Sequence, residues 1–257
     1  MTVVDQPPVH AHQDAKTVWR LRLGVGMFGI SLPILLIAWN WVAGDKVVLP
    51  ESMSGSYYTS ARNLFVGLLC ALGVFLILYR HTKRQDVCTW FAGLFAVVVA
   101  FAPTAPSPPQ VEPGWVSYLH HGAAGALIFT LGLFCFIVFA HETRRISGQP
   151  SSPAGQLRSW VTGALDDFNR DSWSRLYLIC GFIVTVSGLL ALITGVWPAS
   201  WSTGWPSLFL FEAIAVAAFG VAWIAAGWKM RADHNLGPAV PADFRDAEPG
   251  TYQAYTP

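Results

Sequence analysis

Residues 23–43 read LGVGMFGISLPILLIAWNWVA and decide the fold class, because this stretch contains no charged residue. A run of about 20 apolar residues has the length of a helix that spans the hydrocarbon of a bilayer. The run is longer than the hydrophobic region of a signal peptide, and no A-x-A-like cleavage site follows it. We therefore interpret it as a retained transmembrane helix, with Pro33 as an expected kink.

Five further apolar stretches follow, at residues 61–79, 87–101, 116–140, 176–197 and 206–228. The chain is 53% hydrophobic and only 12% charged, whereas soluble domains carry about 25% charged residues. The sequence therefore predicts an all-α polytopic membrane protein, a six-transmembrane-helix bundle over residues 21–230. Residues 1–20 and 231–257 are predicted to be disordered cytoplasmic tails.

Lys and Arg residues set the expected orientation, because cytoplasmic segments are enriched in them. Fourteen of the sixteen fall on one side of the six-span arrangement, and only Lys46 and Arg62 fall on the other. An odd number of spans would break this alternation. The sequence therefore predicts that both termini are cytoplasmic.

The longest connection, residues 141–173, contains one apolar helical face. Its members recur at the spacing of an amphipathic helix: Leu157, Trp160, Val161, Ala164, Leu165 and Phe168. The pattern predicts an interfacial helix on the cytoplasmic side, over about residues 156–168. Docking of a partner protein is the alternative use of this face.

Polar side chains inside a span are costly, so each marks a possible functional site. Glu212 is expected about 9 Å inside the last span, at a rise of 1.5 Å per residue. His120 and His121 lie at a similar depth in the fourth span, and Arg62 and Asn63 begin the second. We predict that these groups meet near the outer surface. The candidate ligand-binding residues are Tyr57, Tyr58, Arg62, Asn63, His120, His121 and Glu212.

Two interpretations of this cluster stay open. It could join three helices as a buried network of ion pairs and hydrogen bonds, or it could line a polar pocket open to the outer leaflet. In both, Glu212 is expected to bond to Arg62, to a His120 or His121 ring, or to a Tyr57 or Tyr58 hydroxyl. Adjacent histidines point about 100° apart on a helix, so no metal site and no cofactor are predicted.

The pocket interpretation predicts an accessory or binding protein for a lipid or small molecule, with membrane lipids as partners. One alternative is an intramembrane enzyme acting on a lipid or isoprenoid, with Glu212 as acid/base and His121 as its partner. Another is a small-solute or proton-coupled transporter. Nucleic acid is excluded as a partner, since the net charge is +1 and no basic patch interleaved with aromatic residues is present.

Glycines in two of the spans are expected to permit close helix packing. They are Gly67 and Gly73 in the second span, and Gly122, Gly125 and Gly132 in the fourth.

Three stretches carry a resemblance to a known family: SYYTSARNLFVG at 56–67, AVVVAFAPTA at 96–105 and FEAIAVAAFGVAW at 211–223. Together they resemble six-span bacterial membrane proteins of the DUF998 type, and more distantly proteins of the Frag1/DRAM/Sfk1 type. The resemblance implies that the protein lies in a bacterial inner membrane. The resemblance implies Tyr57, Tyr58, Arg62, His121 and Glu212 as the site positions. Asn63 stands where the family usually has an acid, which removes one charge from the site.

Overall fold

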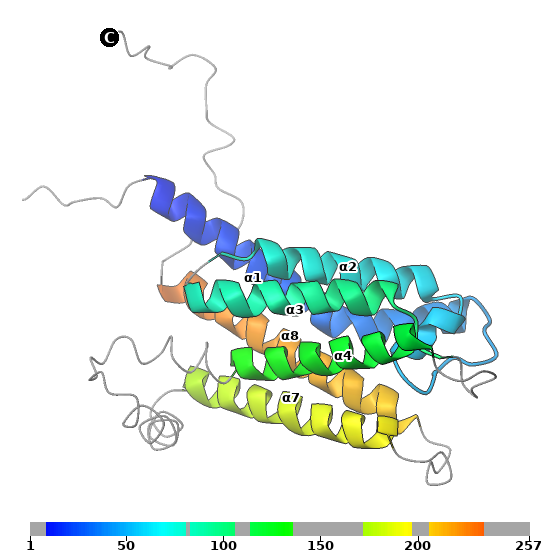
Figure 1. The fold of residues 1–257 in the computed structure, drawn as a ribbon. Helices are drawn as coiled ribbons and strands as arrows, with labels where there is room; N and C mark the ends of the chain where they lie inside the picture. Colours follow the sequence, from blue (N-terminus) through cyan, green and yellow to red (C-terminus); the bar gives the residue numbers. More distant parts are fainter. Residues whose placement is uncertain (1–8, 81–82, 106–113, 136–171, 197–205, 234–257) are drawn as a thin grey trace, which may run out of the picture.

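The structure is a computed structural model that describes residues 9–80, 83–105, 114–135, 172–196 and 206–233. Within these ranges all regular structure is helical (Figure 1). The helices are α1 (Val9–Val42), the short 3-10 helix η1 (Ser54–Tyr58), α2 (Arg62–Leu78), α3 (Lys83–Phe101), α4 (Trp115–Leu133), α7 (Ser172–Val196) and α8 (Ser207–Asp233). The predicted all-α class is confirmed for this part of the chain.

Four of the described helices are long and apolar enough to cross a membrane. They run over Lys16–Val42, Trp115–Leu133, Ser172–Thr194 and Ser207–Ala232. Two further helices, Arg62–Leu78 and Gln85–Phe101, are apolar but shorter. The chain is therefore a helical, membrane-embedded protein.

Several helices run beyond their predicted limits. Helix α1 begins at Val9, so the prediction of a disordered tail over residues 1–20 is wrong for residues 9–20. Helix α8 likewise continues to Asp233, past the predicted end at 228. Hydropathy marks where the apolar layer ends, whereas a helix continues as long as its backbone hydrogen bonds do. The predicted interfacial helix at 156–168 and the tail beyond 233 lie outside the described residues.

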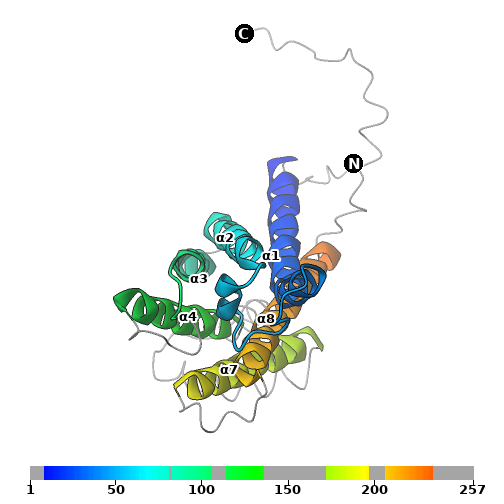
Figure 2. The ribbon, with the colours of Figure 1, turned by 90° about the vertical axis from the view of Figure 1, so that its right-hand side faces the viewer.

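The six α-helices that the structure describes form a closed ring in the order α1, α2, α3, α4, α7, α8, with α8 packed against α1 (Figure 2). Neighbours in the ring run in opposite directions. One end carries the connection from α1 to α2, which includes η1, and we call it the loop end. The other carries Arg22, Arg80 and Arg231, and we call it the basic end.

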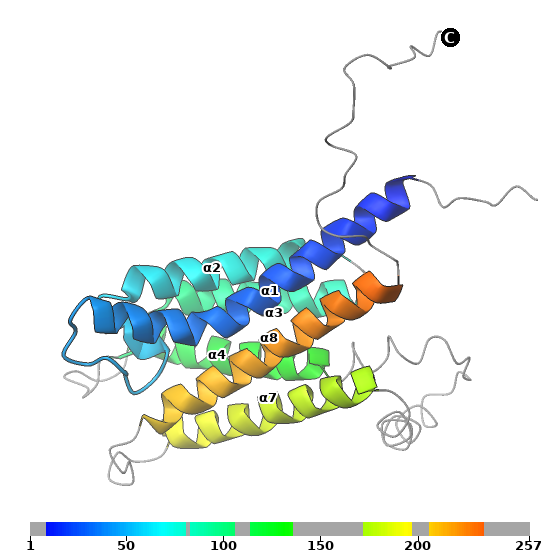
Figure 3. The ribbon, with the colours of Figure 1, turned by 180° about the vertical axis from the view of Figure 1, so that it is seen from behind.

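Two of the helix pairs approach through reciprocal glycines. A Cβ added to Gly26 of α1 would lie 2.7 Å from the Gly220 carbonyl oxygen, and one added to Gly220 would lie 2.6 Å from that of Gly26. The contact of Gly73 in α2 with Gly93 in α3 repeats this arrangement, at 2.9 and 2.5 Å. Figure 3 shows α1 and α8 side by side. Glycine is needed at these positions because a side chain would hold the backbones apart.

The expectation for the other glycines holds in part. Gly132 of α4 lies close to α7, since an added Cβ would be 3.0 Å from Thr185 Oγ1. Gly67, Gly122 and Gly125 have no atom within 4 Å of such a Cβ, so the prediction that they permit close packing is wrong. Sequence alone does not give the rotation of a helix about its axis, which decides which of its glycines meet a neighbour.

Candidate functional site

The loop end is organised by η1, which lies in the connection between α1 and α2. Its turns are closed by main-chain bonds, such as Ser56 N–H to Met53 O at 3.1 Å and Thr59 N–H to Ser56 O at 3.1 Å. The Ser52 hydroxyl accepts the Gly55 N–H at 2.9 Å. Ser54 and Ser56 are buried against the helices. A polar loop segment is thus folded onto the end of the bundle.

Glu212 holds this segment to α8. Its Oε2 accepts the main-chain N–H of Met53 at 2.7 Å, and one turn earlier the Phe209 N–H donates to Glu51 O at 2.9 Å. The predicted side-chain partners of Glu212 are therefore wrong. Among the described residues, no hydrogen bond or ion pair joins it to Arg62, to either histidine or to either tyrosine. The path of the loop, which sequence does not give, brings a main-chain donor closer.

His120 connects three elements of the loop end. The ring is only 2% exposed, and its Nδ1 lies 2.6 Å from Ala102 O at the end of α3. A carbonyl oxygen only accepts, so Nδ1 carries the proton. In the neutral ring Nε2 is then the acceptor, and it lies 2.9 Å from the Ser54 hydroxyl of η1. His120 thereby joins α3, α4 and η1.

His121 lies on a different side of α4 from the buried His120, as the sequence predicts for adjacent helical residues, although the two rings meet edge-on with centroids 5.7 Å apart. It is exposed, and its Nδ1 lies 2.6 Å from Ser117 O of its own helix. No hydrogen bond among the described residues links His121 to Glu212, the pair that the enzyme alternative requires. Within the same residues, no group of three or more His, Cys, Asp or Glu side chains gathers to hold a metal ion.

Arg62, Tyr57 and Tyr58 form an exposed face beside the buried contacts. The Arg62 guanidinium lies over the Tyr57 ring, 4.3 Å from its centroid, and Nη2 donates to the Tyr57 hydroxyl at 3.2 Å. The Tyr58 hydroxyl donates to Thr104 O. Asn63 is exposed next to Arg62 on α2. We call Tyr57, Tyr58, Arg62 and Asn63 the aromatic–arginine face.

The electrostatics of this face favour an anion. Within the described part of the chain no carboxylate forms an ion pair with Arg62, so its charge is shared only with Tyr57. Partial burial raises the pKa of the Tyr58 phenol, Tyr57 adds to the rise, and Arg62 opposes it. At neutral pH the phenol therefore remains a hydrogen-bond donor. The face presents a cation and the Tyr57 hydroxyl but no negative charge, whereas the Tyr58 hydrogen is already donated to Thr104 O.

The polar residues that were predicted to form one cluster therefore form two layers at the loop end. Glu212 and His120 lie inside and bind η1, whereas the aromatic–arginine face and His121 lie outside. Met53 and Ser54, which complete the inner layer, were not predicted. Met53 takes part only through its main chain, which no residue type signals, and Ser54 sits in a serine-rich loop that resembles any solvated connection.

The basic end holds a second polar cluster that the sequence does not reveal. Arg22 is only 2% exposed. Its position at the edge of an apolar stretch instead predicts a solvent-exposed cation that helps to set the orientation of the span in the membrane. Its Nε donates to the Tyr79 hydroxyl at 3.0 Å, and its Nη1 donates to Ala226 O at 3.1 Å. The Tyr79 hydroxyl in turn donates to Gln85 Oε1 at 2.9 Å. One guanidinium therefore connects α1, α2, α3 and α8.

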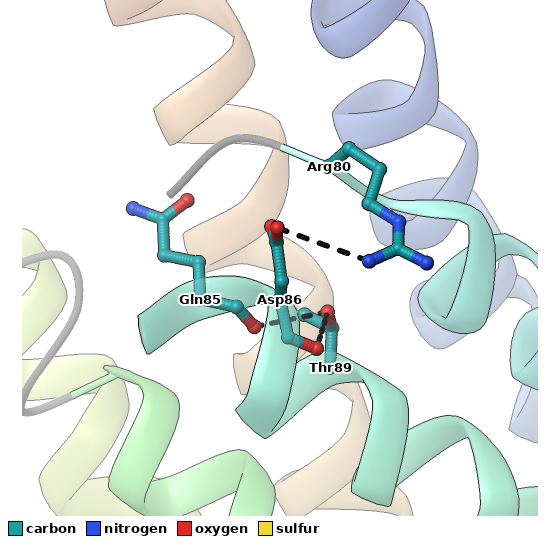
Figure 4. A network of polar contacts seen from close by, with 4 residues as sticks. All are labelled: Arg80, Gln85, Asp86 and Thr89. Atoms are coloured by element: carbon teal, nitrogen blue, oxygen red, sulfur yellow. Dashed lines mark hydrogen bonds and ion pairs between the residues drawn. The ribbon is translucent and has the colours of Figure 1, made fainter. Parts of the chain in front are cut away.

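Around this cluster the core is aromatic and the rim is polar. The Phe134 ring stacks on the Trp223 ring with centroids 5.0 Å apart. The Tyr79 ring meets the same Trp223 ring edge-on, with centroids 4.9 Å apart. The buried Thr89 hydroxyl donates to Gln85 O at 3.0 Å, and at the rim Nη1 of exposed Arg80 lies 4.0 Å from Asp86 Oδ2 (Figure 4). A water-exposed pair of this kind contributes at most about 1 kcal/mol. The buried Arg22 contacts are the ones that hold this end.

Comparisons with known protein families, with curated proteins and with solved structures find no match.

Proposed function

We propose that the chain is a six-span protein of the bacterial cytoplasmic membrane that binds an anionic group at the aromatic–arginine face. In this proposal both termini are cytoplasmic and the loop end faces outward. The ligand is a lipid headgroup or a small anionic molecule, so the protein has a binding or accessory role. The sequence bias of Lys and Arg supports the orientation, and the lengths of α2 and α3 lie within the range of about 17–25 residues that span a bilayer.

The observation that carries the proposal is the exposed Arg62 guanidinium, which has an aromatic partner but no carboxylate partner among the described residues. A guanidinium presents a planar set of donors that matches phosphate and carboxylate oxygens. Tyr57 fixes the orientation of these donors, which lowers the ordering cost of binding. At the end of an apolar helix, the groups of matching charge are lipid headgroups and soluble anions.

Binding is tested with purified protein in detergent micelles, titrated with phosphatidylglycerol and, separately, with inorganic phosphate. Loss of a charge-assisted hydrogen bond costs about 1.5–3 kcal/mol, so Arg62→Gln is expected to weaken binding about tenfold or more. Lys46→Gln is the matched control. It removes an exposed cation from the same end of the bundle, and in the described structure this cation does not lie over an aromatic ring. Equal affinity of Arg62→Gln and the unmodified protein would contradict the proposal. Binding of phosphatidylglycerol without phosphate identifies a lipid ligand.

The topology is tested with reporter fusions after Ala43, Arg80, Phe101, Ala140 and Trp197. The six-span proposal expects these positions to alternate out, in, out, in and out. Two successive fusions on the same side would exclude it.

We also propose kinship with the DUF998-type family. Its support is that the three stretches carrying the resemblance, although far apart in sequence, all have residues at the loop end, where the first bonds to the second and the third bonds to the loop before the first. Tyr58 of the first bonds to Thr104 of the second, and Glu212 of the third bonds to Met53, just before the first.

The enzyme and transporter alternatives have less support. Glu212 bonds to the main-chain N–H of Met53, just before η1, and His121 bonds to its own helix, so neither is directed at a shared reacting centre. Discontinuous helices, which are typical of transporters, do not occur among the described spans, and α1 is continuous through Pro33.

A further inference from the structure

We infer that residues 51–59, which contain η1, form a lid that opens and closes over the loop end, with Glu212 and His120 as its latches. This inference goes beyond the proposed binding function and does not require it. The segment reaches the surrounding helices through a small number of polar contacts. Glu212 of α8 holds Met53, His120 of α4 holds Ser54, and the Tyr58 hydroxyl bonds to Thr104 after α3. The Phe209 N–H of α8 also donates to Glu51 O at 2.9 Å, and Arg62 of α2 donates to the Tyr57 hydroxyl at 3.2 Å.

The contacts of the lid are weaker in kind than those of the bundle. Of the lid's apolar side chains, Met53 is buried in the core and Tyr57 packs against the core, whereas Tyr58 is 51% exposed. The other six residues of the segment are Glu, Ser, Gly or Thr, so two side chains supply its apolar contact with the core. The Ser56 side chain is fully buried, and its hydroxyl has no hydrogen-bond partner in the described structure. A hydroxyl that leaves water without gaining a partner destabilises the closed position. A 3-10 helix of five residues adds little stability of its own.

The base of the connection is fixed independently of the lid. Asp45 Oδ2 accepts both the Ser60 N–H at 3.0 Å and the Ser60 hydroxyl at 2.7 Å, which ties the start of the connection to its end. Gly44 precedes this tie with φ +74, a left-handed conformation that glycine adopts without strain. The residues between the two tied ends can therefore lift while α1 and α2 stay in place.

Opening has a chemical consequence, because both latches are ionisable side chains that lie within spans at the loop end. Ionisable side chains within a span are usually functional rather than incidental. In the closed position Glu212 and His120 bond to the lid, and in the open position both are free for another partner. The geometry thus points to a lid whose movement controls access to these two side chains.

The test is hydrogen–deuterium exchange of the full-length protein in lipid nanodiscs, read at the Met53 amide. Amides inside α2 and α8 serve as references for unfolding of the whole bundle. Glu212→Gln weakens the bond to Met53 directly and should raise its exchange rate about tenfold, since charged acceptors form bonds about twice as strong as neutral ones. Asp86→Asn makes the same acid-to-amide change at the basic end, and should leave the Met53 rate unchanged.

Ser54→Ala is the decisive variant, because it removes the His120 latch and leaves the Met53–Glu212 bond intact. If the lid moves as one unit, Met53 exchange rises in this variant too, by about fivefold for the loss of one hydrogen bond. The α2 and α8 amides should not change in either variant. An unchanged Met53 rate in Ser54→Ala would overturn the lid, as would equal acceleration of Met53 and the helix amides.

Discussion

The two ends of the bundle secure their polar side chains in different ways. At the basic end, Arg22 lies in the core and connects four helices through Tyr79, Gln85 and the Ala226 carbonyl. At the loop end, Glu212 and His120 reach out of their helices and bond to a connecting segment. The first arrangement joins helix to helix, whereas the second joins helices to a loop.

This difference predicts different stabilities for the two ends. Separating the helices at the basic end would leave a guanidinium and its partners buried and unpaired, which is costly. Moving the lid away at the loop end exposes Met53 and breaks a few hydrogen bonds, which contribute about 1 kcal/mol each, or about 2 kcal/mol for the bond to the Glu212 carboxylate. The basic end should therefore be the rigid part of the molecule, and the loop end the part that moves.

The largest expected effect is at Arg22. Arg22→Ala should lower the free energy of unfolding by about 3–5 kcal/mol, the usual result of breaking a buried charged network. Arg22→Lys should lower the free energy of unfolding by less than Arg22→Ala does. It should still lower it, because one ammonium group does not replace the planar, multidirectional donors of a guanidinium. Unfolding in mixed micelles measures both. The control is Arg20→Ala, since Arg20 is exposed on the same helix. Equal, small losses of unfolding free energy in Arg22→Ala and Arg20→Ala would contradict the prediction that the basic end is the rigid end.

The next largest loss of stability is expected in the middle of the bundle, between the two ends. Gly220→Leu should cost about 3 kcal/mol, because its Cβ would lie 2.6 Å from the Gly26 carbonyl oxygen and overpack the α1–α8 contact. Gly125→Leu is the matched control, since its Cβ would meet nothing within 4 Å. The same unfolding assay applies. A loss as large in the control would show that a leucine is disfavoured generally, and not at the close contact.

A smaller effect is expected at Glu212. Glu212→Ala should cost about 2 kcal/mol, the value for a hydrogen bond to a charged group. The loss should be local, so limited proteolysis within residues 51–59 should accelerate while cleavage at the basic end stays unchanged. Acceleration at both ends would mean that Glu212 holds the whole bundle, which would contradict the comparison.

The smallest effects are expected on the aromatic–arginine face. Tyr58→Phe removes the bond to the Thr104 carbonyl and should cost at most about 1 kcal/mol. Arg62→Gln should change stability by no more than about 0.5 kcal/mol, because Arg62 is exposed and its partner is a neighbouring tyrosine. Thermal unfolding in detergent measures both. A large loss in Arg62→Gln would give this arginine a structural role and weaken the binding proposal.

The candidate site could be predicted from the sequence only in part. An acid in a span and a histidine pair at similar depth were visible as costly polar groups, and the structure does place Glu212 and His120 at one end of the bundle. Their partners were not visible, because Met53 contributes a main-chain N–H and Ala102 a main-chain carbonyl. The burial of Arg22 was not predicted for a related reason. A charge at the edge of an apolar stretch resembles the exposed cations that set the orientation of a membrane span.

The sequence by itself determined the all-α class and the approximate place of every described long helix. Both follow from local properties, because apolar runs and backbone hydrogen bonds within a helix need no distant partner. Only the tertiary structure decided that Arg22 is buried, that Gly26 meets Gly220 while Gly125 meets nothing, and that Glu212 holds a loop. These depend on how each helix is rotated about its axis and on the path of a connection, which are set by contacts between residues far apart in the chain.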